Sequence, residues 1–172
     1  MALIDNLSRY YSRPKTFAGV PQWLYGGDDY GRYVLSVPLC IDYVIQEGLY
    51  LEANCIKSRP EKDVTLVMAY KPAAGLSGPM ARLDWEPLHH HENRGGISGE
   101  WAWKRIEGTH LHSFELNQPL GWERMAKNNL PLALPVLDAL NGLRDMLGYL
   151  GNLWNITDIQ RIPEPEWEPR LV

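Results

Sequence analysis

Apolar and polar residues alternate with a period of two over several stretches of the chain. These stretches are 33–41, 49–56, 64–70, 80–85 and 109–116. A period of two places successive side chains on opposite faces of an extended chain, so each stretch is predicted to be a β-strand. The linkers between the first four are short, polar or rich in Gly and Pro, which favours an antiparallel meander over βαβ units. We therefore expect an antiparallel sheet of about five strands within residues 33–117.

Two other regions have apolar residues at the three- and four-residue spacing of an amphipathic helix. Residues 1–13 are predicted to form a short N-terminal helix that ends before Pro14. Residues 134–154 are predicted to form the main helix, near the C-terminus, whose apolar stripe should pack on one face of the sheet. The Pro-rich tail at 161–172 is expected to be extended, with Trp167 either anchoring it to the domain or contacting a partner.

A long connection separates the last two predicted strands. It covers residues 86–108 and shows little periodicity. Connections in compact domains usually have about four to six residues, and much longer ones tend to bind ligands or to be disordered. This one is rich in His, Trp, Gly and charged residues, so we predict a functional loop.

The composition is that of a single globular domain of the α+β class. The chain has 172 residues, of which 45% are hydrophobic and 22% are charged, values typical of one domain covering 1–172. Its formal net charge of −4 argues against a broad nucleic-acid-binding surface. Several basic residues nevertheless lie in one stretch, so a nucleotide or nucleic acid stays among the candidate partners: Arg82, Arg94, Lys104 and Arg105.

The sequence predicts a cytoplasmic protein. No apolar stretch reaches the roughly 18 to 20 residues of a membrane span, and the N-terminus does not have the pattern of a signal peptide. Cys40 and Cys55 lack the CxxC spacing and are expected to be reduced and buried. We expect no membrane partner, and the oligomeric state has no signature in the sequence.

All five histidines lie between Arg82 and Asn117. In a strand, His110 and His112 project to the same side with Cα atoms about 6.5 Å apart. Two such imidazoles can act as acid and base near neutral pH, or can converge on one ion or phosphate. Arg82 and Asp84 share a face of the predicted fourth strand, either as an ion pair or as an anion-binding arginine held by its carboxylate. The candidate catalytic residues are therefore His110, His112, Arg82 and Asp84.

The His110 and His112 pair could also hold a metal ion. Zinc sites use at least three protein ligands, so a further one would have to come from the long loop. Neighbouring residues on an extended chain point in opposite directions, so His89, His90 and His91 cannot all face one target. His90 and His91 are the best candidates, and we assign His90 as the third ligand.

The aromatic residues suggest a binding surface. The chain has seven Trp and nine Tyr against two Phe, and the first two types combine a large apolar ring with a polar tip. Such residues are enriched at interfaces. Asn93 and Arg94 precede a Gly-Gly pair whose backbone N–H groups could face an anion. The candidate binding residues are Trp85, Asn93, Arg94, Trp101 and Trp103.

Three hypotheses of function follow. The first is a protein-interaction module with exposed Trp residues as anchors and a protein as its partner. The second is a metal-independent phosphodiesterase-like, ribonuclease-like or nucleotide-binding site around His110 and His112, with Arg82 stabilising negative charge. The third is a histidine-ligated metal-binding protein. No cofactor is expected under the first two hypotheses, whereas zinc or another divalent metal is required by the third.

Overall fold

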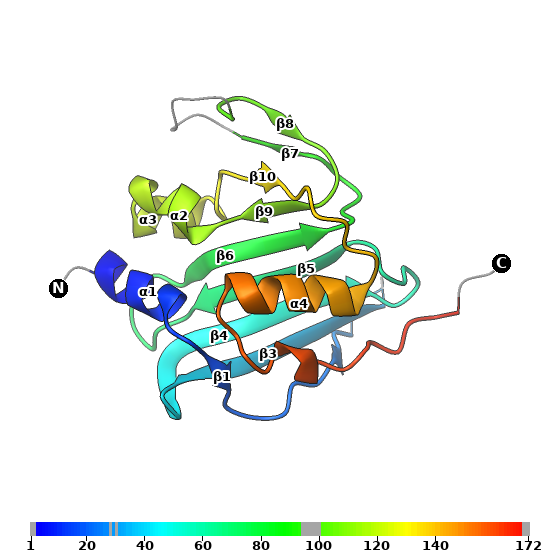
Figure 1. Cartoon of the computed structure of the whole chain (residues 1–172), viewed down its shortest axis with the longest axis horizontal. Helices are drawn as coiled ribbons and strands as arrows, with labels where there is room; N and C mark the ends of the chain where they lie inside the picture. The colour runs from blue at the N-terminus through cyan, green and yellow to red at the C-terminus, as the bar shows by residue number, and fades with distance from the viewer. Residues whose placement is uncertain (1–2, 28, 30, 94–100, 170–172) are drawn as a thin grey trace.

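An antiparallel sheet forms the centre of the protein (Figure 1). The computed structural model describes residues 3–27, 29, 31–93 and 101–169. Within this part of the chain the main sheet has eight strands in the order β1-β3-β4-β5-β6-β9-β10, with β2 pairing with β3. Its strands are β1 (Thr16–Phe17), β2 (Leu24–Tyr25), β3 (Arg32–Ile41), β4 (Val44–Ile56), β5 (Val64–Tyr70), β6 (Gly78–Trp85), β9 (His110–His112) and β10 (Leu134–Pro135).

The four long strands β3 to β6 lie where the period-two pattern predicts them. Alternate residues along each strand, such as Leu35 and Val37 on β3, are buried in the main hydrophobic core. The remaining strands are only two or three residues long, too short to show a period. The fold class is α+β with an antiparallel sheet, and the sheet has more strands than the five expected.

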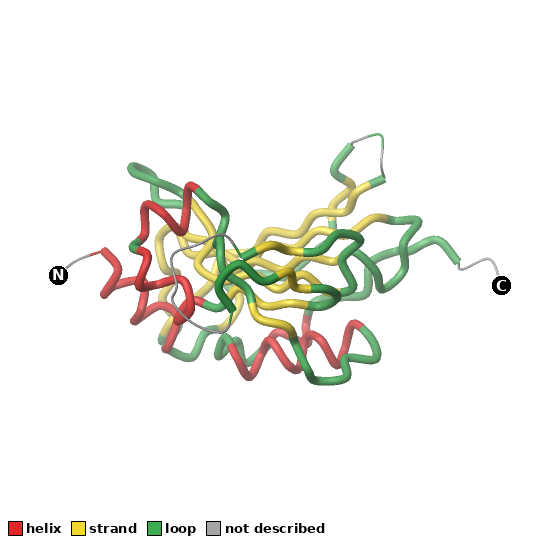
Figure 2. Tube along the Cα trace, turned by 90° about the horizontal axis from the view of Figure 1, so that it is seen from above, coloured by secondary structure: helices red, strands yellow, loops and turns green. Residues whose placement is uncertain are grey.

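Helix α4 (Leu143–Leu153) runs along one side of the strands (Figure 2). It buries Leu143, Met146, Leu147 and Leu150 in the same core as the sheet. The predicted helix at 134–154 is too long at its N-terminal end, because Leu134 and Pro135 form β10. Val136 and Leu140 pack on the core from an irregular segment, which explains the misleading spacing.

The other helices are short and gather at one end of the sheet (Figure 1). They are α1 (Leu3–Ser12), α2 (Phe114–Asn117), η1 (Gln118–Leu120) and α3 (Trp122–Lys127), while η2 (Ile159–Arg161) follows α4. Helix α1 lies within the 1–13 range expected for an N-terminal helix. The predicted strand at 109–116 ends at His112, because the Ser113 side chain accepts a hydrogen bond from the Leu116 N–H and caps α2.

The long 86–108 connection contains a second, two-stranded sheet. Its strands β7 (His91–Glu92) and β8 (Arg105–Ile106) pair antiparallel, with His91 opposite Ile106. Figure 1 shows this hairpin beyond the β9–β10 edge of the main sheet. The connection is therefore not a structureless loop.

The C-terminal tail has no helix or strand from residue 162 to residue 169. Trp167 packs against the core, which agrees with its expected role as an anchor to the domain. Among the described residues, none of the helices has the length and apolar character needed to cross a membrane.

Candidate functional site

The register between β6 and β9 brings the four candidate catalytic residues together. Arg82 lies opposite His112, and Asp84 lies opposite His110. Side chains directly opposite each other on one face of an antiparallel pair are close enough to interact. Leu83, between Arg82 and Asp84, is buried in the main core, so these four polar side chains belong to the other face of the sheet.

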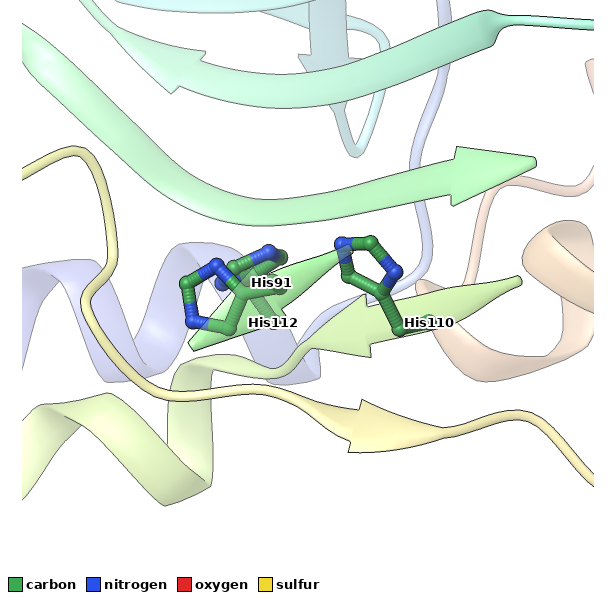
Figure 3. A group of neighbouring side chains, drawn as sticks. All are labelled: His91, His110 and His112. Carbon is green, nitrogen blue, oxygen red and sulfur yellow. The ribbon is translucent and has the colours of Figure 1, made fainter. Parts of the chain in front are cut away.

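A third imidazole, from β7, joins the pair on β9 (Figure 3). One nitrogen from each of His91, His110 and His112 lies within 4.8 Å of the others. The ring centre of His91 lies 4.5 Å from that of His112 and 5.6 Å from that of His110. The ring centres of His110 and His112 are 5.3 Å apart. His112 is 0% exposed and His110 is 3% exposed, so the cluster is shielded from bulk water.

Each imidazole donates one N–H to a backbone carbonyl. His110 Nδ1 lies 2.7 Å from the Gly108 carbonyl oxygen, and His112 Nδ1 lies 2.6 Å from that of Leu130. His91 Nε2 lies 3.1 Å from the carbonyl oxygen at position 131. A carbonyl oxygen can only accept, so these three nitrogens carry the protons. In the neutral rings, His110 Nε2, His112 Nε2 and His91 Nδ1 then keep their lone pairs.

Asp84 and Arg82 sit against these lone pairs. The Asp84 Oδ2 atom lies 3.2 Å from His110 Nε2 and 3.3 Å from His112 Nε2. Arg82 donates from Nε to Asp84 Oδ2 at 2.8 Å and from Nη2 to His112 Nε2 at 2.6 Å. The other carboxylate oxygen, Oδ1, accepts from the Thr65 hydroxyl at 2.9 Å. The carboxylate is therefore fixed from two sides.

The surroundings set the charges of the cluster. Burial lowers the pKa of His112 to about 4, and the positive charge of Arg82 acts in the same direction. Burial likewise lowers the pKa of His91. Burial alone would raise the pKa of Asp84, but its contacts with the His110 and His112 rings and the positive charge of Arg82 hold this pKa well below its usual range. At neutral pH, His112 is neutral and Asp84 is ionised.

With these assignments, the inner nitrogens of the cluster and the Asp84 carboxylate are all acceptors, and too few protons lie between them to form hydrogen bonds. A neutral His112 accepts from Arg82, so its Nε2 has no proton to give to Asp84. The contact between His110 Nε2 and Asp84 Oδ2 also joins two acceptors when His110 is neutral. Either an extra proton on His110 or a cation at the centre converts this contact into an attractive one. The arrangement can therefore bind a proton or a metal ion.

Two of the three backbone carbonyls that orient the cluster belong to one irregular segment, residues 130–133. Two buried asparagines hold its second half. The Asn117 amide donates to the Leu132 carbonyl at 2.9 Å and accepts from the Leu132 N–H at 3.0 Å. The Asn93 amide makes the same pair of bonds with Ala133, at 2.9 and 2.8 Å. The segment is thus fixed by side chains rather than by strand pairing, and it presents its first two carbonyls to His112 and His91.

The structure corrects the predicted third histidine. His90 is exposed, and its Nε2 lies 3.3 Å from Glu92 outside the cluster. His91, the first residue of β7, lies in the cluster where the sequence analysis placed His90, which directly precedes this strand. His89 is also exposed and does not join the cluster.

The predicted binding residues do not form one surface. Trp85 is buried, so it cannot act as a surface anchor as predicted. Trp103 is 78% exposed, and Trp101 is half-buried with the Lys104 ammonium 5.7 Å from its ring centre. Asn93 is buried, its side-chain amide bonds to the 130–133 segment, and its backbone N–H donates to the Lys104 carbonyl at 2.9 Å. Arg94 lies outside the described residues.

Sequence reasoning missed Thr65, Asn117 and the 130–133 segment. Thr65 faces Asp84 through the β5–β6 register, which no local pattern reveals. Asn117 acts across 15 positions of the chain, on a segment whose Leu and Pro residues resemble ordinary core. Comparison with protein-family models, curated proteins and solved structures finds no match for the chain.

Proposed function

We propose that the protein binds a divalent transition-metal ion of the zinc type through His91, His110 and His112, with Asp84 as a fourth ligand. The observation that carries this proposal is the convergence of lone pairs without enough protons between them. Imidazole and carboxylate groups are common ligands of zinc and its neighbours in the periodic table.

The distances at Asp84 support a tetrahedral site. Zinc–nitrogen and zinc–oxygen bonds of about 2.0 to 2.2 Å place neighbouring ligand atoms of a tetrahedron about 3.4 Å apart. The Asp84 Oδ2 atom is 3.2 Å from His110 Nε2 and 3.3 Å from His112 Nε2. One nitrogen from each histidine lies within 4.8 Å of the others, and metal binding would have to bring these three atoms closer together.

The outer hydrogen bonds also support it. Metal-binding histidines usually donate their second N–H to a carbonyl or carboxylate, which fixes the ring and its tautomer. All three imidazoles do this, with the carbonyls of Gly108, Leu130 and Pro131. The Asp84 carboxylate is held by Thr65 and Arg82. The ligands are thus pre-oriented.

Arg82 competes with a metal ion for one of these lone pairs. Its Nη2 atom donates to the His112 lone pair that a metal would use. Binding therefore requires this nitrogen to move away from His112, while the bond from Arg82 Nε to Asp84 can remain. We expect the metal-free protein to be folded, because the arginine partly replaces the charge of the ion.

The burial of the cluster favours a metal over direct acid–base catalysis. A phosphodiester would have to contact His110 and His112, which are almost fully buried. A metal ion needs only their lone pairs. A metal-free reaction at the pair nevertheless remains the alternative that the experiment below distinguishes.

The proposal is tested by elemental analysis of protein purified without a metal-affinity step, followed by chelator treatment and titration with Co²⁺. We expect one ion for each chain, and the visible absorption of Co²⁺ should report nitrogen ligands in a tetrahedral field. His110→Ala and His112→Ala should each weaken binding by at least about 100-fold, since even the loss of an outer hydrogen-bond partner costs about 10- to 100-fold.

His89→Ala is the matched control, because His89 is exposed and lies near His91 in the chain. It should bind Co²⁺ like the wild type. The proposal fails if the chelated protein ignores Zn²⁺ and Co²⁺, or if folded His110→Ala and His112→Ala variants bind as well as the wild type. Phosphodiesterase activity in metal-free protein that is lost in the same variants would support the alternative.

A further inference from the structure

We infer that the metal-loaded site binds an oxyanion, of the phosphate or carboxylate class, between the ion and Arg82. This inference rests on the proposed function and adds the chemical class of the site's ligand. It is carried by the charge at the cluster and by the hydrogen bonds of the Arg82 guanidinium.

The positive charge of Arg82 and the negative charge of Asp84 cancel each other, so a bound metal ion would add an unbalanced positive charge. Arg82 contributes one positive charge and Asp84 one negative charge, and their side chains are 11% and 15% exposed. The histidines are neutral when they act as ligands. A divalent ion would then leave a net charge of about +2 in a largely buried site, which is strongly unfavourable without an anion.

The other described carboxylates nearby are directed elsewhere. Glu86 is exposed and interacts with the Thr109 hydroxyl, and Glu92 is exposed and pairs with His90. Within the described part of the chain, Asp84 is the carboxylate in contact with the clustered imidazoles. Because no other carboxylate of the described residues balances the charge, we assign the missing negative charge to a bound ligand.

Arg82 provides a donor for that ligand. Its Nε donates to Asp84 at 2.8 Å, and its Nη1 donates to the Asn129 carbonyl at 3.0 Å. These two bonds keep the guanidinium beside the site while Nη2 moves off the His112 lone pair. When a metal takes the lone pair of His112, the N–H groups of Nη2 lose their acceptor but still face the site.

An oxyanion satisfies both requirements at once. One oxygen can bind the metal, which accepts a fifth ligand readily in the case of zinc and cobalt. A second oxygen can accept from Arg82 Nη2, since planar guanidinium groups match carboxylate and phosphate oxygens. Arg82 and Asp84 are partly exposed, as is His91, so a small anion can approach the cluster from the side of these residues.

The inference is tested by calorimetric and visible-absorption titration of Co²⁺-loaded protein with inorganic phosphate and, separately, with acetate. We expect one of these anions to bind and to change the Co²⁺ spectrum. Tighter binding of phosphate would identify a phosphoryl group as the ligand chemistry, and tighter binding of acetate would identify a carboxylate. Arg82→Gln should weaken binding of the preferred anion at least 10-fold while Co²⁺ stays bound.

Arg82→Lys and Arg9→Gln complete the design. Lysine keeps the charge without the planar fork and should give intermediate anion binding, which keeps the test valid if Arg82→Gln is unstable. Arg9 is an exposed arginine on α1, so Arg9→Gln should bind like the wild type. The inference is overturned if Co²⁺ binds but neither anion does, or if Arg82→Gln binds the anion as well as the wild type. If Co²⁺ itself does not bind, the proposed function fails and the inference fails with it.

Discussion

Two buried polar groups in this protein differ in whether their hydrogen bonds are complete. The Lys15 side chain is buried, and its Nζ donates to the carbonyls of Tyr10, Tyr11 and Arg13 at 2.8, 2.8 and 2.6 Å. Three backbone carbonyls at the C-terminal end of α1 thus surround the Lys15 nitrogen. The histidine cluster has the opposite character, since its inner nitrogens and the Asp84 carboxylate are acceptors with too few protons between them.

The difference separates structural from binding roles. A set in which every donor has its acceptor stabilises the fold and has nothing left to offer a ligand. We call Lys15 and the two asparagines at the 130–133 segment the closed sets, and the histidine cluster the open set. Closed sets should lose stability when altered, and the open set should lose ligand binding. The following predictions test this division.

The largest loss of stability is expected for Asn117→Ala. Its amide holds both the N–H and the carbonyl of Leu132, and all these groups are buried. Leaving them without partners should lower the free energy of unfolding by about 3 to 4 kcal/mol. Urea unfolding of the chelated protein measures this loss. A loss below about 1 kcal/mol would show that the set is not closed.

Lys15→Met should have the next largest effect. The methionine keeps most of the apolar volume but leaves three carbonyls at the end of α1 without a donor. We expect a loss of about 2 kcal/mol in unfolding free energy at pH 7. Co²⁺ binding should be unchanged, because this side chain does not belong to the metal site. Weakened Co²⁺ binding in a folded variant would contradict the separation of the two regions.

The stability difference between the wild type and Lys15→Met should also depend on pH. Burial lowers the pKa of Lys15 to about 7, well below that of an unfolded lysine. Between these two values the unfolded chain binds more protons than the folded chain, so the wild type gains stability as the pH rises. We expect the difference to grow by about 1 kcal/mol for each pH unit between pH 7 and 9. Urea unfolding of both proteins across this range measures the slope, and a flat difference would refute the lowered pKa.

The smallest effect on stability is expected for His110→Gln in the presence of a chelator. The variant loses one hydrogen bond to the carbonyl of Gly108, an exposed residue, and keeps much of the side-chain volume. The free energy of unfolding should fall by about 1 kcal/mol or less. A loss as large as that of Asn117→Ala would place the histidines in a closed set and remove the argument for a ligand.

The sequence was sufficient for the long strands and for the His110 and His112 pair of the cluster. The period of two located β3 to β6. The spacing of His110 and His112 placed both side chains on one side of a strand, because alternate residues of an extended chain face the same way. The end of β9 was not predictable from alternation, since Ser113 starts a helix through a cap. The N-terminal limit of α4 was missed because Val136 and Leu140 have the sequence spacing of a helix, although they pack on the core from an irregular segment.

The remainder of the site depends on long-range register. The choice of His91 over His90 is set by the pairing of β7 with β8 inside the long connection, and neither strand has a detectable period. The role of the 130–133 segment depends on Asn93 and Asn117, which reach it from 40 and 15 positions away. Such contacts leave no trace in local composition.

The central claim is that His91, and not its neighbour His90, completes a metal site. Calorimetric titration of the chelated wild type, His91→Ala and His90→Ala with Zn²⁺ tests it most directly. The account predicts that one ion binds to the wild type and to His90→Ala with similar affinity, and that His91→Ala binds at least about 100-fold more weakly. Equal Zn²⁺ affinity of the two variants, or no binding to the wild type, would contradict it.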